Sequence, residues 1–186
     1  ENSGTSNDGI ICTEANTTLS VVQTAQSYVW STGQTTQSIQ VNPTVTATYT
    51  VTVTFLAGCV YTKSDTIIVE DTVVKNSNNN GFGSLRNILY CAVEGSTVTY
   101  DLPTVDHTTL TEELTIDKNV IIQGTISLRP EITIDYNSVM NGVIISSNKK
   151  LILDNIDIKT LNALNQSTFK GPGDVEVIGI THVSAQ

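Results

Sequence analysis

The sequence predicts an all-β chain of two domains, a β-sandwich over residues 1–70 and a short parallel β-helix over 71–186 capped by one α-helix. Short runs rich in Thr, Val and Ile alternate apolar and polar residues, which is the period of a strand. Similar runs with Asx- and Gly-rich corners recur imperfectly through the second half, as in a stack of coils. Only residues 84–93 show the apolar spacing of an amphipathic helix.

Composition excludes several partners. The formal net charge of −9 argues against a nucleic-acid partner, which needs a basic surface, and against docking on anionic lipid. No apolar run approaches the roughly 18 residues of a spanning helix, so we expect no membrane insertion. The absence of a signal peptide at Glu1 fits a secreted chain that has lost its signal.

The positions of the three cysteines suggest one disulfide. Cys12 and Cys59 lie in the strand-rich first half, whereas Cys91 lies inside the expected helix, where a small core residue is the simplest interpretation. We therefore expect a Cys12–Cys59 disulfide and an oxidising, extracytoplasmic compartment. Closing a loop of 59 − 12 = 47 residues would stabilise the fold by about 4 kcal/mol. The alternative is two buried free thiols.

The first half reads as consecutive strands separated by turns. In "TYTVTVT", Tyr49, Val51 and Val53 share one face and threonines the other, as in a half-buried antiparallel strand. Trp30, the only tryptophan, falls in a central run and is expected to anchor the core. A sugar-stacking platform is the alternative role for its ring.

These residues carry a family resemblance. The stretch "YVWSTGQTTQSIQVNPTVTATYTVTVTFLAGC" resembles immunoglobulin-like modules, close to the PKD type, in large secreted surface proteins of Gram-negative bacteria. The resemblance implies an immunoglobulin-like β-sandwich that serves as a spacer or adhesive unit. It carries over no catalytic residue.

The expected helix has a cap and a one-sided apolar stripe. Ser84 can cap its first turn, and Gly95 can end it. The stripe consists of Leu85, Ile88, Leu89 and Ala92. Because an open β-helix end would expose unpaired strand and apolar core, we expect this helix to cover the first coil.

The repeats that follow predict a parallel β-helix with an irregular period near 20 residues. "LTIDKN" and "ITIDYN" are offset by 132 − 114 = 18 residues, and "NVIIQG" and "GVIISS" by 143 − 120 = 23. Asn119, Asn137 and Asn155 recur at a spacing of 18, which suggests asparagine at a recurring corner.

A second resemblance covers residues from about 72 to 160. The segments Gly83–Arg86, "GSLR", and Leu114–Gly124, "LTIDKNVIIQG", resemble the signature that opens right-handed β-helix proteins of bacterial surfaces. The resemblance implies a right-handed parallel β-helix. Tyr100 stands where that signature usually has Phe. Residues 167–186 are then expected to supply the final coil.

Three aspartates are weak candidates for chemistry. If their coils were in register, Asp117, Asp135 and Asp154 would form a column of carboxylates able to act as nucleophile and acid, or to share a calcium ion. We favour the alternative that Asp-x-Asn is a corner motif that caps backbone groups. No catalytic residue, metal or other cofactor is otherwise expected.

Two threonines are candidates for glycosylation. "DTI" and "DTV" resemble the Asp-Thr-aliphatic acceptor of bacterial periplasmic O-glycosylation, with Thr66 and Thr72 as the acceptors.

The expected function is therefore a non-catalytic extracellular structural or adhesion module on the surface of a Gram-negative bacterium, the C-terminal part of a larger secreted or surface-anchored adhesin. Its expected partners are other surface or secretion-machinery proteins, or glycans. One alternative is a β-helix protein that binds or cleaves polysaccharide. Others are a C-terminal export and surface-sorting domain, or a filament subunit that self-assembles through the β-helix end.

Overall fold

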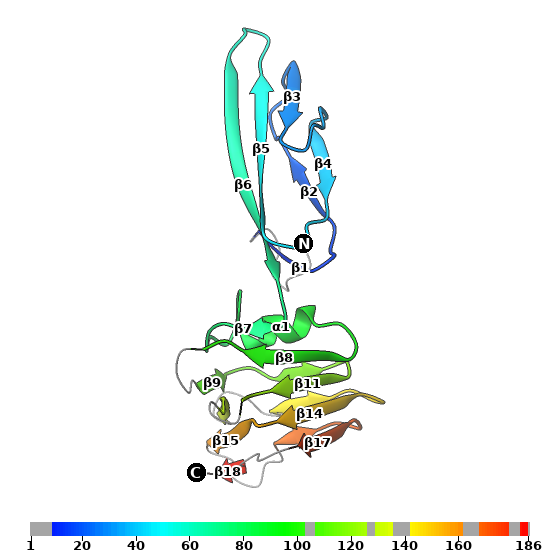
Figure 1. Ribbon diagram of the computed structural model, residues 1–186, viewed down its shortest axis with the longest axis vertical. Coiled ribbons are helices and arrows are strands. Elements are labelled where there is room, and N and C mark those ends of the chain that lie inside the picture. Colours follow the sequence, from blue (N-terminus) through cyan, green and yellow to red (C-terminus); the bar gives the residue numbers. More distant parts are fainter. Residues whose placement is uncertain are drawn as a thin grey trace. The chain divides into compact units, whose positions relative to one another are not determined.

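The computed structural model describes residues 9–102, 107–125, 129–135, 142–161, 168–178 and 183–185. The chain divides into two compact units, Glu1–Glu70 and Asp71–Gln186. Apart from one short helix, the regular structure of the described residues is all β (Figure 1).

The first unit contains two sheets. Its strands are β1 (Ile10–Cys12), β2 (Thr17–Ser20), β3 (Ser27–Trp30), β4 (Ser38–Val41), β5 (Ala47–Thr54) and β6 (Val60–Glu70). One sheet has the order β1-β6-β5-β3, and the other pairs β2 with β4. All pairs are antiparallel except β1 with β6.

The two sheets share an apolar core. Val51 and Val53 of β5 belong to the same buried cluster as Ile39 and Val41 of β4. Trp30 lies in this cluster at 6% exposure, and its Nε1 donates a hydrogen bond to the carbonyl oxygen of Thr36 at 2.8 Å. The prediction of Trp30 as a core anchor is confirmed.

Strand β5 has the predicted two faces. While its apolar residues face the core, its threonines face outward and pair with hydroxyls of β6. The pairs are Thr48–Thr66 at 2.9 Å, Thr50–Ser64 at 2.8 Å and Thr52–Thr62 at 3.2 Å. Such cross-strand hydroxyl pairs stabilise an exposed sheet face.

The second unit is a parallel β-solenoid of three sheets. Its strands are β7 (Val73–Val74), β8 (Ser96–Tyr100), β9 (His107–Leu110), β10 (Leu114–Ile116), β11 (Val120–Gln123), β12 (Glu131–Asp135), β13 (Val143–Ile145), β14 (Lys150–Asp154), β15 (Asp157–Leu161), β16 (Phe169–Lys170), β17 (Asp174–Ile178) and β18 (Val183–Ala185). The sheets have the orders β17-β14-β11-β8-β7, β18-β15-β12-β9 and β10-β13-β16.

Successive coils place one strand in each sheet, so that β8, β11, β14 and β17 form a ladder (Figure 1). Val98, Ile122 and Leu153 lie at matching positions of this ladder, and each is buried in the same core cluster. The predicted parallel β-helix is confirmed. Strands β16, β17 and β18 supply strands of a further coil, as expected for the last residues.

The predicted coil period is wrong. Ser96 pairs with Val120, an offset of 120 − 96 = 24 residues, and Val120 pairs with Leu151, an offset of 151 − 120 = 31. "LTIDKN" begins in β10 and "ITIDYN" in β12, which belong to different sheets, as do the strands of "NVIIQG" and "GVIISS". The similar motifs are different sides of a coil, because every side needs the same alternation to fill the interior.

Helix α1 (Leu85–Cys91) caps the solenoid as predicted. The Ser84 hydroxyl accepts a hydrogen bond from the N–H of Asn87 at 3.3 Å, which confirms the N-cap. The stripe residues all lie in the core cluster of the coils: Leu85, Ile88, Leu89 and Ala92. The helix is shorter than the predicted span of 84–93, because Ala92 already has extended backbone and Val93 is exposed.

Gly83 and Arg86 of the "GSLR" motif each have a structural role. Gly83 has a φ of +75°, and a Cβ there would press on Asn76 and Lys75. Arg86 leaves the apolar stripe and donates to the carbonyl oxygens of Glu112 and Glu113 at 2.7 and 2.5 Å. Burial lowers the pKa of Arg86, although the Glu112 charge opposes this. The guanidinium therefore ties the capping helix to the first coil.

Candidate functional site

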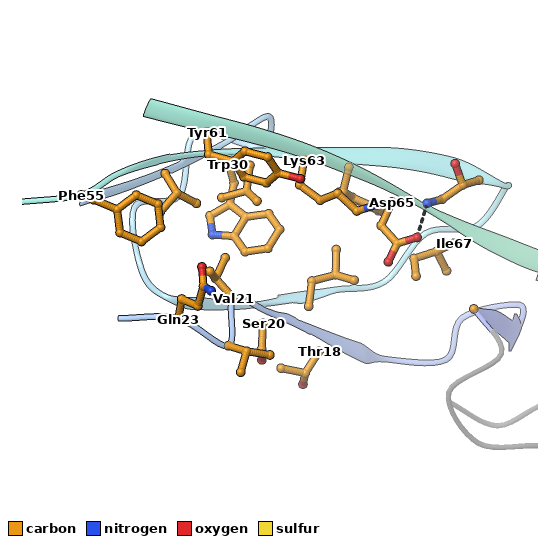
Figure 2. A pocket seen from close by; sticks show the side chains of 17 residues that line it. Thr18, Ser20, Val21, Gln23, Trp30, Phe55, Tyr61, Lys63, Asp65 and Ile67 are labelled. Atoms are coloured by element: carbon orange, nitrogen blue, oxygen red, sulfur yellow. Dashed lines mark hydrogen bonds between the residues drawn. The ribbon is translucent and has the colours of Figure 1, made fainter. Parts of the chain in front are cut away.

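A cleft of about 700 Å³ lies within the first unit. One wall consists of the inner faces of β5 and β6, and the other consists of β2 and the residues just after it (Figure 2). Among the described residues of this unit, the sheet of β2 and β4 has two strands and the sheet that faces it has four.

Aromatic groups line one end of the cleft. Figure 2 shows the rings of Trp30, Phe55 and Tyr61 close to one another there. The Trp30 side chain is buried in the core, whereas that of Tyr61 is 59% exposed. Since aromatic rings offer large apolar faces at low entropic cost, this end suits a flat apolar surface of a ligand.

Polar groups also line the cleft. Lys63 and Asp65 project from β6, and Gln23 lies in the segment that follows β2, at the end where Figure 2 shows Trp30 and Phe55. The Asp65 carboxylate accepts a hydrogen bond from the N–H of Thr66 at 3.0 Å. The cleft thus combines a cation, an anion and an amide with aromatic rings, a set that can bind polyhydroxylated or peptide ligands.

The three candidate aspartates are not brought together. Asp117 lies in the corner between β10 and β11, Asp135 ends β12, and Asp154 ends β14. Asp135 pairs in register with Leu161, and Asp154 with Gln123 and Ile178 in a different sheet. The three aspartates therefore do not form the column that was considered as the less favoured alternative. The reason is the coil period, which differs from the spacing on which the column was based.

Two of the recurring asparagines act at corners in different ways. The Oδ1 atom of Asn119 accepts a hydrogen bond from the N–H of Lys150 in the next coil at 2.7 Å. Asn155 has left-handed backbone with a φ of 55°, and its Nδ2 donates to Asp154 at 3.0 Å. The Asn119 contact agrees with the corner-capping interpretation, whereas the Asn155 contact joins two side chains. Asn137 lies outside the described residues.

The cysteine prediction is wrong in its pairing. Cys12 and Cys91 are the disulfide-bonded cysteines, and Cys59 is a free, exposed thiol. Cys12 pairs in register with Glu70 at one end of β6, whereas Cys59 precedes Val60 at the other. Strand β6, which separates the two positions, spans roughly 35 Å at about 3.3 Å per residue. This distance is far beyond the reach of a disulfide.

The glycosylation candidates occupy different settings. Thr66 lies within β6, and its hydroxyl is hydrogen-bonded to Thr48. Thr72 is exposed in the short segment between β6 and β7, where Asp71 accepts a hydrogen bond from the N–H of Val73 at 2.9 Å. Both threonines are exposed, and of the two only Thr72 lies outside regular structure.

The described residues contain neither a cluster of metal-binding side chains nor a membrane-spanning helix. No group of three or more His, Cys, Asp and Glu side chains lies so that it could hold a metal ion within the part of the chain that the structure describes. In the same residues, no helix has the length and apolar character required to cross a bilayer.

Comparisons with known proteins leave the family open. No protein-family model, curated protein or solved structure matches the chain.

The cleft was not predicted from the sequence. Lys63 and Asp65 read as ordinary solvated charges, and only the alternation of "YTKSD" placed them on the same face as Tyr61. The alternation does not specify that β2 and β4 pair as a two-stranded sheet, because this pairing depends on the tertiary structure.

Proposed function

We propose that the protein is a non-catalytic structural and adhesion module of the surface of a Gram-negative bacterium, belonging to a larger secreted or surface-anchored adhesin. In this proposal the first unit is an immunoglobulin-like module close to the PKD type, and the second a right-handed β-helix. Support comes from the two sequence resemblances and from the way that polar side chains are used in the second unit.

The observation that carries the structural role is that these side chains tie neighbouring coils together. Gln123 donates to Asp154 at 2.8 Å, and Lys150 forms an ion pair with Glu176. Each pair spans two adjacent coils of the same sheet. Side chains so engaged stabilise the stack and are not arranged around a common point where a substrate would react.

A catalytic screen tests the non-catalytic role. The full chain and an Asp117→Asn, Asp135→Asn, Asp154→Asn variant are incubated with a panel of acidic and neutral polysaccharides. We expect neither protein to release reducing ends or unsaturated products. Release by the native chain that the variant loses, with circular dichroism unchanged, would overturn the proposal in favour of a polysaccharide-cleaving enzyme.

We further propose that the adhesive ligand is a glycan bound in the cleft of the first unit. The exposed ring of Tyr61 and the polar groups of Gln23, Lys63 and Asp65 in the same cleft support this choice, because sugars combine apolar ring faces with hydroxyls that need both donors and acceptors.

A glycan microarray probed with the fluorescently labelled full chain tests the ligand class. We expect Tyr61→Ala to weaken binding to the selected glycans by about tenfold. Tyr90→Ala is the matched control, since Tyr90 is a similarly exposed tyrosine in α1 that is not among the residues lining the cleft. Binding that is absent from the array, or equal for Tyr61→Ala and the native chain, would contradict glycan recognition at the cleft.

A further inference from the structure

The chain contains two asparagines that are followed directly by glycine, Asn80 before Gly81 and Asn141 before Gly142. An asparagine in this position can modify itself in water, because the backbone nitrogen of the glycine can attack the side-chain amide carbon and no Cβ on the glycine hinders the approach. The attack requires that the glycine nitrogen can move toward that carbon. The surroundings of the two glycines therefore decide which asparagine reacts in the folded protein.

Gly81 lies in an open part of the second unit. Asn80 and Gly81 are both exposed and outside helix and strand, and a Cβ at Gly81 would meet no atom within 4 Å. The carbonyl oxygen of Gly81 accepts a hydrogen bond from the N–H of Ser84 at 3.1 Å, whereas the N–H of Gly81 donates to no group among the described residues. The attacking nitrogen is therefore not held in place by a hydrogen bond.

A single long contact holds the Asn80 side chain. Its Nδ2 donates to Oε2 of Glu112 at 3.4 Å, which is long for a hydrogen bond. The preceding Asn79 is fixed more firmly, because its Oδ1 accepts from the N–H of Thr111 at 3.2 Å and its carbonyl oxygen accepts from Nε of Arg86 at 3.3 Å. The Asn80 side chain can thus turn toward the nitrogen that follows it while the residue before it stays anchored.

Gly142 has the opposite surroundings. It is buried and directly precedes β13, which pairs with β10. Its carbonyl oxygen accepts a hydrogen bond from the N–H of Leu114 at 3.1 Å. Because the backbone that carries this nitrogen is fixed beside β10, attack on Asn141 requires local opening of the sheet, which costs free energy.

We propose that Asn80 is a site of spontaneous covalent modification, at which the folded protein converts asparagine to a mixture of aspartate and isoaspartate. The nitrogen of Gly81 forms a bond to Cγ of Asn80, and the amide group leaves as ammonia with the proton of that nitrogen. The five-membered succinimide ring that remains is opened by water. Cleavage between the nitrogen and Cγ gives aspartate, and cleavage between the nitrogen and the main-chain carbonyl carbon gives isoaspartate.

The modification changes both charge and backbone in the loop before α1. It adds a negative charge to a chain whose formal net charge is already −9, and Oε2 of Glu112 loses the Nδ2 donor. Isoaspartate also inserts an extra carbon into the backbone next to Asn79, to which Arg86 of the capping helix donates. The loop that joins the helix to the first coil therefore carries a change that accumulates with the age of the protein.

Peptide mapping by mass spectrometry tests the site. The full chain is kept in mildly alkaline buffer, with and without urea, and is digested over a time series. In the folded chain, conversion at Asn80 should be faster than at Asn141 by at least about tenfold, and in urea the two rates should become similar. Absence of conversion at Asn80, or conversion at Asn141 that is as fast in the folded chain, would overturn the proposal. A preference for Asn80 that persists unchanged in urea would contradict selection by the structure.

Two variants test the assignment by ion-exchange chromatography, on which the modified native chain should appear as a more acidic species. Asn80→Gln should abolish this species, because the longer side chain forms the corresponding ring far more slowly. Asn78→Gln is the matched control and should retain it, since Asn78 precedes Asn79 and not a glycine. An acidic species that survives in Asn80→Gln, or that Asn78→Gln removes, would place the modification elsewhere. Because Asn80 belongs to the second unit, these results do not depend on the proposed glycan binding.

Discussion

The ammonium group of Lys118 donates a hydrogen bond to the carbonyl oxygen of Tyr90 at 2.6 Å and a longer one to that of Leu89 at 3.3 Å. The last carbonyls of a helix have no partner within it, so a side chain from elsewhere must satisfy them. Lys118 comes from the corner before β11. The cap is therefore fixed at its end by Lys118 and near its start by Arg86.

Lys118→Met should lower the free energy of unfolding by about 1 kcal/mol, because the carbonyls of Leu89 and Tyr90 lose a charged donor while the aliphatic stem is kept. Urea unfolding followed by circular dichroism measures the change. Lys159→Met is the control, since Lys159 lies at an outward position of β15. A loss equal to that of the control would show that the contact does not stabilise the cap.

Tyr100→Phe should raise the free energy of unfolding by about 1 kcal/mol, since the buried hydroxyl of Tyr100 has no hydrogen-bond partner among the described residues. Phe is also the residue that the resembled signature usually has there. The difference should appear in urea midpoints at pH 7. If Tyr100→Phe is instead less stable, the hydroxyl has a partner that the described residues do not include.

The buried hydroxyl of Tyr100 should also make the free energy of unfolding depend on pH in the alkaline range. Burial raises the pKa of Tyr100, so the hydroxyl stays protonated in the folded state when it ionises in the unfolded one. Its contribution is fully present below the unfolded pKa of about 10 and is lost as pH rises toward the folded value. The stability advantage of Tyr100→Phe should therefore widen above that pH. A constant advantage across the series would contradict a buried ionisable hydroxyl.

The Glu94 carboxylate should make the free energy of unfolding depend on pH in the acidic range. Its hydrogen bond from Lys149, at 3.0 Å, lowers the pKa of Glu94, and a hydrogen bond from the N–H of Asn119 adds to this. A lowered carboxyl pKa contributes stability that is present above the unfolded value of about 4.3 and is lost as pH falls through the folded value.

Glu94→Gln should therefore differ from the native chain most above that pH and progressively less in more acidic buffer. Urea titrations of Glu94→Gln, Lys149→Met and the double variant measure this, and the two substitutions should be non-additive at neutral pH. Additive effects, or a difference that does not change with pH, would show that the pair is not coupled.

Thiol reactivity tests the cysteine assignment. The native, unreduced chain should react with one equivalent of iodoacetamide, at Cys59, and with three equivalents after denaturation and reduction. Cys59→Ser should abolish the first reaction. Peptide mapping that finds the label on Cys91 instead would support the Cys12–Cys59 pairing that the sequence suggested.

The local spacing of apolar residues predicted most of the fold. The alternation in "TYTVTVT" predicted which face of β5 is buried, and the stripe from Leu85 to Ala92 predicted that the helix would cover a coil end. Both succeed because side-chain direction follows from backbone period, which is a local property. The bounds of α1 were less well predicted, because Ala92 leaves helical geometry before the stripe ends.

The cleft, and the placement of the aspartates, could not be predicted in the same way. Asp135 and Asp154 occupy similar "ID" steps in the sequence, yet they belong to different sheets. Their separation depends on how many residues each corner uses, and corners of variable length change the register without changing the strand pattern.

The sequence by itself determined that the chain is all β, that one capped helix covers a stack of parallel coils, and that Trp30 is buried in the first unit, because these follow from the spacing of apolar side chains. Only the tertiary structure decided the coil period, the state of each cysteine and the cleft of the first unit. Those depend on which distant segments become neighbours, and an alternation with a period of two residues is satisfied equally well by several pairings.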